Sequence, residues 1–184
     1  MNFKLLGVIA IICAPFLYID SSVTAKNSWS WQSGLFDFIY MLGWMGSIAA
    51  LHKMKAFGTS KFAKIAVIIQ FVFLSLAQVW NVWLIVGASD SLLFHMLDMC
   101  WPLSNIWMIV IGITALRAKR LEGWKRYVPL LVGLWFPVAV VPAITIGFYY
   151  LAGPYSAIAF ALLGLVVYKS NDKETPGYST VSLA

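Results

Sequence analysis

The stretch FAKIAVIIQFVFLSLAQVWNVWLIVG, residues 62–87, decides the fold of this chain. Apolar residues follow one another through it, and no acidic residue interrupts them. As an α-helix rising about 1.5 Å per residue, a segment of this length crosses the roughly 30 Å of hydrocarbon in a bilayer. The stretch therefore predicts a transmembrane helix.

The whole chain has the composition of a membrane protein. Of its 184 residues, 61% are hydrophobic and 11% are charged, whereas a soluble domain is about half apolar and about a quarter charged. Other apolar runs complete a set of expected helices at 3–20, 35–52, 62–87, 91–117, 127–149 and 153–169. We predict an all-α integral membrane bundle of six transmembrane helices. It forms one domain over 1–169, followed by a flexible cytoplasmic tail at 170–184.

The distribution of positive charge predicts the orientation of the bundle. With the N-terminus in the cytoplasm, every one of the 13 Lys and Arg residues except Lys26 falls in a cytoplasmic segment. Cytoplasmic loops carry such an excess of Lys and Arg. Both termini are therefore expected in the cytoplasm and the chain in the cell membrane. In this interpretation, the basic residues behind the net charge of +6 determine the orientation of the helices in the membrane. No nucleic-acid partner is therefore expected.

The acidic residues show the opposite distribution. Asp20, Asp37, Asp90 and Asp98 fall in the outer half of the expected bundle. Their charge makes the outer mouth mildly attractive to cations.

Two other features of the chain leave alternatives open. Lys4, the apolar run after it and SSVTAKN (residues 21–27) also resemble a secretory signal peptide, although we favour a retained first helix. ALHKMKAFG (50–58) and ALRAKRLEG (115–123) share their spacing of Ala-Leu, basic residues and Gly. The two loops either resemble each other by chance or mark a duplicated helical hairpin with parallel copies.

The segment FHMLDMCWPLSN, residues 94–105, carries polar residues inside the fourth apolar run. At 100° per residue, His95, Asp98, Pro102 and Asn105 fall within an arc of about 80° on one helix face. A charged Asp near the middle of a bilayer costs roughly 2.5–3.5 kcal/mol, so this face is expected to turn inward. Pro102 lacks an amide hydrogen, which leaves the carbonyl group of Asp98 without its helical donor.

The second and third helices carry polar stripes of their own. The second has Asp37, Tyr40, Trp44 and Ser47, and the third has Gln70, Gln78 and Asn81. We predict an outward-facing polar site between these three helices. Asp98 would supply negative charge and His95 a titratable partner, and the other ligand-binding candidates are Asn105, Asn81, Gln78, Tyr40 and Asp37. The alternative is that the stripes only hold the helices together, at about 0.6 kcal/mol per hydrogen bond.

Catalytic and cofactor motifs are nearly absent from the sequence. We find no GxSxG, HExxH, phosphate-binding loop or cysteine pair with metal spacing, so no catalytic residue, metal or cofactor is expected. His52 and His95 are expected a membrane thickness apart, which excludes a haem held between them. Cys13 and Cys100 fall at similar depths, and two inert buried thiols are favoured over a disulfide.

Three interpretations of function follow. The first is a small protein that binds or transports a small ligand or cation at its outer face. The second is a non-catalytic accessory subunit whose stripes pack against a partner membrane subunit. The third is an intramembrane enzyme, for which we find no pair of nucleophile and base. In each of them the lipid bilayer surrounds the chain.

Overall fold

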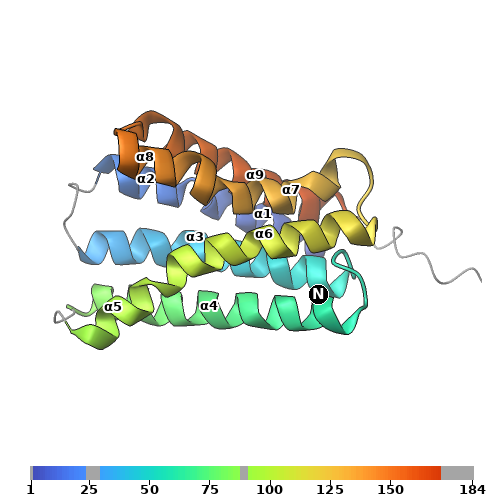
Figure 1. Ribbon diagram of the computed structural model, residues 1–184, viewed down its shortest axis with the longest axis horizontal. Helices are drawn as coiled ribbons and strands as arrows, with labels where there is room; N and C mark the ends of the chain where they lie inside the picture. Colours follow the sequence, from blue (N-terminus) through green and yellow to red (C-terminus); the bar gives the residue numbers. More distant parts are fainter. Residues whose placement is uncertain (1, 24–29, 88–90, 171–184) are drawn as a thin grey trace, which may run out of the picture.

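The computed structural model describes residues 2–23, 30–87 and 91–170, and these residues form helices without any strand (Figure 1). The helices are α1 (Phe3–Cys13), α2 (Phe16–Val23), α3 (Trp31–Lys53), α4 (Lys61–Ile85), α5 (Leu92–Asp98), α6 (Cys100–Ala118), η1 (Gly123–Tyr127), α7 (Val128–Trp135), η2 (Phe136–Val140), α8 (Val141–Ile146), η3 (Tyr149–Leu151) and α9 (Ala152–Lys169). The expected tail at 170–184 lies outside the described residues except for Ser170.

These helices join into six segments that are long and apolar enough to cross a membrane, which confirms the expected number of spans. The segments are Phe3–Val23, Trp31–Lys53, Lys61–Ile85, Leu92–Ala118, Gly123–Ile146 and Ala152–Lys169. The surface fits a bilayer as solvent. Ile68 is 61% exposed, whereas Gln70, two residues further along the same helix, is completely buried.

Serine side chains fix where three of the spans begin. Ser30, Ser60 and Ser91 each accept a hydrogen bond from the backbone amide three residues later, at 3.2, 3.1 and 3.2 Å. Such N-caps satisfy amide groups that a helix end leaves free. Hydropathy alone predicts that this helix begins at residue 35. The cap at Ser30 explains why α3 begins earlier, at Trp31.

Prolines break three of the spans. The first span is interrupted between Cys13 and Phe16, around Pro15. The fourth is interrupted at Met99, between α5 and α6, because Pro102 has no amide hydrogen for the carbonyl group of Asp98. In the fifth span, the wide π-helical turn of η2 separates α7 from α8. Pro137 lies in this turn and Pro142 lies at the start of α8, and prolines of this kind commonly accompany helix irregularities.

The six spans pack as a ring in sequence order. Each span contacts the next along the chain, and the first lies between α3 and α9, which closes the ring. The described chain ends, Asn2 and Ser170, lie at the same end of the bundle as the α3–α4 and α6–η1 connections (Figure 1). Every Lys and Arg of the described residues lies at this end. We call it the basic end, and the opposite end the acidic end.

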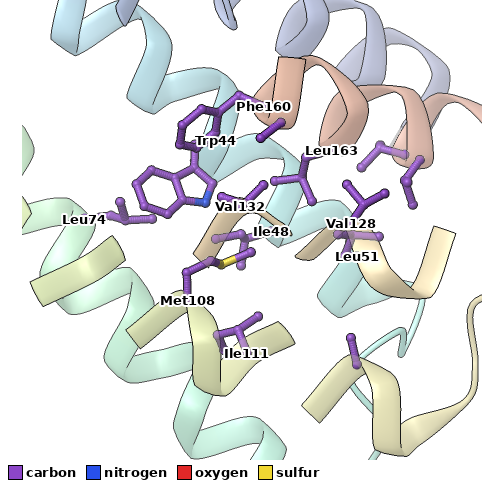
Figure 2. Packing of buried hydrophobic residues seen from close by; sticks show 14 of the residues in the cluster. Trp44, Ile48, Leu51, Leu74, Met108, Ile111, Val128, Val132, Phe160 and Leu163 are labelled. Carbon is purple, nitrogen blue, oxygen red and sulfur yellow. The ribbon is translucent and has the colours of Figure 1, made fainter. Parts of the chain in front are cut away.

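Aromatic and aliphatic side chains fill the middle of the ring. Figure 2 shows Trp44 packed among Leu74, Met108 and Phe160 from three neighbouring helices. The ring centres of Trp44 and Phe160 lie 5.0 Å apart, and Phe160 also meets Trp135 at 6.3 Å. The centre of the bundle is therefore an aromatic core.

Glycines allow two helices to approach closely at α6 and α7. A Cβ atom at Gly112 would lie 2.4 Å from the Cα atom of Leu130, and one at Gly133 would lie 2.5 Å from the backbone nitrogen of Ile109. Small residues at such crossings are typical of membrane helices, where packing rather than the hydrophobic effect drives association.

Candidate functional site

The seven candidate residues do not gather in one pocket but divide into three groups with different surroundings. Gln78 and Asn81 lie between α3 and α4, Tyr40 and Asn105 lie in the aromatic core, and Asp37, Asp98 and His95 lie toward the acidic end. On the fourth span, the interruption at Met99 places His95 and Asp98 on α5 and Asn105 on α6, and His95 is exposed rather than turned inward as expected.

Gln78 and Asn81 form hydrogen bonds within the protein. The Gln78 Nε2 atom donates to the carbonyl oxygen of Phe38 at 3.1 Å. Asn81 Nδ2 donates to Gln78 Oε1 at 2.8 Å and to the sulfur of Met41 at 3.2 Å. These bonds join α3 to α4, which is the packing role that the sequence leaves open for such amides.

Tyr40 lies in the aromatic core with 1% of its surface exposed. Its hydroxyl group accepts a hydrogen bond from Trp101 Nε1, and its ring packs edge-on against Phe160 at 5.5 Å. Trp101 was not among the expected site residues, because a hydropathy pattern counts Trp as apolar and takes no account of its single donor.

A second set of buried polar atoms lies deeper in the bundle. Asn105 Nδ2 donates to the carbonyl oxygen of Trp101 at 2.9 Å. Its Oδ1 atom, both amide atoms of Gln70 and Nε1 of Trp44 make no hydrogen bond among the described residues. The bond from Trp107 Nε1 to the carbonyl oxygen of Ala66, at 2.9 Å, shows that α4 and α6 run side by side at this depth. These helices therefore keep uncharged polar groups inside the apolar core.

Toward the acidic end, the Asp37 carboxyl group lies within electrostatic range of two other carboxyl groups. Asp37 interacts electrostatically with both Asp20 and Asp98, although the three belong to α3, α2 and α5. The Asp37 Oδ1 atom is shielded from solvent and has no hydrogen-bond partner among the described residues. Asp98 is half-buried, and its nearest charge partner is His95, which is exposed. Asp20 was counted in sequence among the outer acids but was not placed in the site.

An open cavity of about 490 Å³ lies at the same end of the bundle. Its walls come from the start of α3, the end of α4 and α5, and they are Ser30, Trp31, Leu84, Ile85, Val86, Gly87 and Phe94. These are the three spans between which the sequence predicts a site. The cavity is more apolar than expected, because Gln78 and Asn81 turn toward α3 instead of toward it.

The described residues offer little for metal or haem binding. Among them, no three His, Cys, Asp or Glu side chains are grouped so that they could hold a metal ion. His52 lies in the last turn of α3 at the basic end, whereas His95 lies in α5. Cys13 and Cys100 are free thiols, as expected, and both are buried.

The fold and this end of the bundle define a class: an all-helical protein with six helices able to cross a membrane and an acidic group at one end. Comparison with protein-family models, with curated proteins and with solved structures found no match.

Proposed function

We propose that this protein binds a small cation at its acidic end, with Asp37 and Asp98 supplying the negative charge. The observation that carries the proposal is the buried Asp37 Oδ1 atom, which has no hydrogen-bond partner among the described residues and lies within electrostatic range of Asp20 and Asp98 from two other helices. Each ionised carboxyl group inside a membrane protein is costly, so such residues are candidates for function.

The surrounding charges support a cation rather than an anion. No Lys or Arg of residues 2–23, 30–87 and 91–170 lies at the acidic end. Lys26 and Asp90 belong to the connections between spans, and their opposite charges cancel in the net charge of these connections. A cation placed between Asp37 and Asp98 would stabilise their ionised forms, which burial disfavours.

The acidic end would face the outside of the cell membrane. The gathering of the described Lys and Arg at the opposite end is typical of a cytoplasmic side. In this orientation both termini lie in the cytoplasm, and the cation arrives from outside. The proposal concerns binding, because Tyr40, Trp44, Trp101 and Phe160 fill the bundle between the acidic end and the basic end.

A role as an accessory subunit receives less support. In that interpretation, the polar stripes face a partner subunit. Gln70, Gln78, Asn81 and Asn105 are instead buried between helices of this chain. A partner subunit would meet an apolar surface.

The test measures thermal unfolding of the purified protein in detergent, with sodium, potassium, calcium or tetramethylammonium chloride at constant ionic strength against N-methylglucamine chloride. At 100 times its dissociation constant, a ligand stabilises the folded state by about 2.7 kcal/mol. We expect at least one cation to raise the unfolding temperature of the wild type, and this rise to disappear in Asp37→Asn and Asp98→Asn.

The matched control is Glu122→Gln, which removes an exposed carboxylate at the basic end. It is expected to retain the whole cation effect. The proposal fails if no cation stabilises the wild type, or if the rise is the same size in Asp98→Asn.

A further inference from the structure

We propose that the cavity at the acidic end takes an organic monocation with an apolar body, a protonated or quaternary amine, whose positive charge faces Asp98. This inference rests on the proposed function and names the class of cation. It follows from the lining of the cavity, which is mostly apolar, whereas a bare metal ion needs several oxygen ligands.

The size and lining of the cavity fit an apolar body. A volume of about 490 Å³ lies within the roughly 300–1,000 Å³ typical of small-molecule sites. Leu84, Ile85 and Val86 are among its lining residues, and Ser30 supplies the only side-chain hydroxyl group among the described lining residues. Sodium or calcium ions prefer several oxygen ligands. An apolar group instead gains free energy by leaving water for these walls.

Two aromatic rings also line the cavity. Phe94 lines it from α5, and Trp31 lines it from the start of α3. Phe94 is held in place by Trp80, with ring centres 5.5 Å apart, and by Trp83 at 6.2 Å. The faces of aromatic rings attract cations, and quaternary ammonium groups are often bound in this way.

Asp98 lies on the same helix as Phe94, although it is not among the residues that line the cavity. It follows Phe94 by four residues on α5, which places it one helical turn, or about 6 Å, further along the same face. Asp98 also lies within electrostatic range of Asp37. An amine whose charged group sits on the Phe94 side of the cavity would therefore have its charge nearest to Asp98.

The experiment uses benzyltrimethylammonium chloride as the probe, with sodium chloride and neutral benzyl alcohol as comparisons. Binding to the detergent-solubilised full-length protein is followed by titration calorimetry and by thermal unfolding. We expect saturable binding of benzyltrimethylammonium, much weaker binding of benzyl alcohol, and loss of benzyltrimethylammonium binding in Asp98→Asn.

Aromatic variants test the wall itself. Phe94→Leu and Trp31→Leu remove a ring from the cavity but keep an apolar side chain. Each is expected to weaken benzyltrimethylammonium binding by about 3- to 30-fold, which corresponds to one cation–π contact. Trp31 is exposed, so its replacement tests the wall even if Phe94→Leu disturbs folding. The matched control is Phe62→Leu, at an exposed ring on the basic end of α4, which should leave binding unchanged.

The outcomes separate the two proposals. If sodium, potassium or calcium gives an effect that depends on Asp98 while benzyltrimethylammonium does not bind, the ligand class is wrong and the proposed function stands. If benzyl alcohol binds as tightly as the cation, or if both aromatic variants bind like the wild type, the ligand class is again wrong. If no cation gives an effect that depends on Asp98, both proposals are wrong.

Discussion

Replacing Gln70 by methionine is expected to stabilise the protein. Gln70 is completely buried, and neither Oε1 nor Nε2 of its amide has a hydrogen-bond partner among the described residues. A buried polar group without a partner costs about 1–3 kcal/mol. Methionine has a similar length and a similar helix propensity, so it fills the same space without that cost. We therefore expect Gln70→Met to raise the free energy of unfolding by about 1–3 kcal/mol.

Gln78→Met is the matched control on the same helix. Gln78 donates to the carbonyl oxygen of Phe38 and accepts from Asn81, so the same substitution breaks two hydrogen bonds. It also leaves Asn81 with one partner fewer. The expected effect has the opposite sign, a loss of about 1–3 kcal/mol.

Equilibrium unfolding in mixed micelles, with increasing sodium dodecyl sulfate, measures both changes through far-ultraviolet circular dichroism. The comparison depends on the sign of the two effects, so a common error in the extrapolation does not alter it. A loss of stability of 1 kcal/mol or more in Gln70→Met would refute the reasoning. It would mean that the amide of Gln70 has a partner of its own in the membrane.

Three further predictions concern packing, the aromatic core and orientation. Gly112→Ala should destabilise the bundle by about 1–3 kcal/mol, because its Cβ atom would meet the backbone of α7. Gly46→Ala should not, because its Cβ atom would lie 3.7 Å from its nearest neighbour. Equal unfolding midpoints for the two variants would contradict this prediction. Tyr40→Phe should cost about 1–3 kcal/mol in the same assay, because it leaves the indole donor of α6 buried without a partner; a stability unchanged from wild type would argue against that bond. In a background without the native cysteines, an impermeant thiol reagent should label Ser28→Cys but not Thr59→Cys in intact cells; the reverse pattern would invert the topology.

Much of the fold could be predicted from sequence because each span is recognised from the pattern of its own residues. Apolar length predicted the six spans, since it depends only on the residues of one helix. The fourth span was expected as one helix, and its interruption at Met99 was not predicted although the missing amide hydrogen of Pro102 was noted. The start of α3 was missed by hydropathy. It depends on the hydrogen bond from Ser33 to Ser30, which a hydropathy average does not contain.

The arrangement of the candidate site was less predictable. Helical periodicity tells which side chains share a face, but it does not tell which neighbour that face meets. Gln78 and Asn81 therefore turned out to bond α3, and Asp20 joined the acidic group only because α2 packs beside α3. The similarity between 50–58 and 115–123 keeps both of its interpretations, a chance resemblance and a duplicated helical hairpin. Gly58 and Gly123 both have positive φ angles, of 86° and 56°, as loop glycines of either origin do.

The contrast between amides and carboxylates argues that the acidic end is functional. Packing between membrane helices needs hydrogen-bond donors and acceptors, and Gln78 and Asn81 meet that need without charge. Asparagine has the same shape as aspartate and would serve packing at Asp37 and Asp98 without repulsion between them. Instead, a buried carboxyl group at Asp37 lies within electrostatic range of Asp20 and Asp98, and its ionisation inside an apolar bundle is costly. A bound cation would offset that cost, so Asp37→Asn together with Asp98→Asn should stabilise the cation-free protein while abolishing its response to cations.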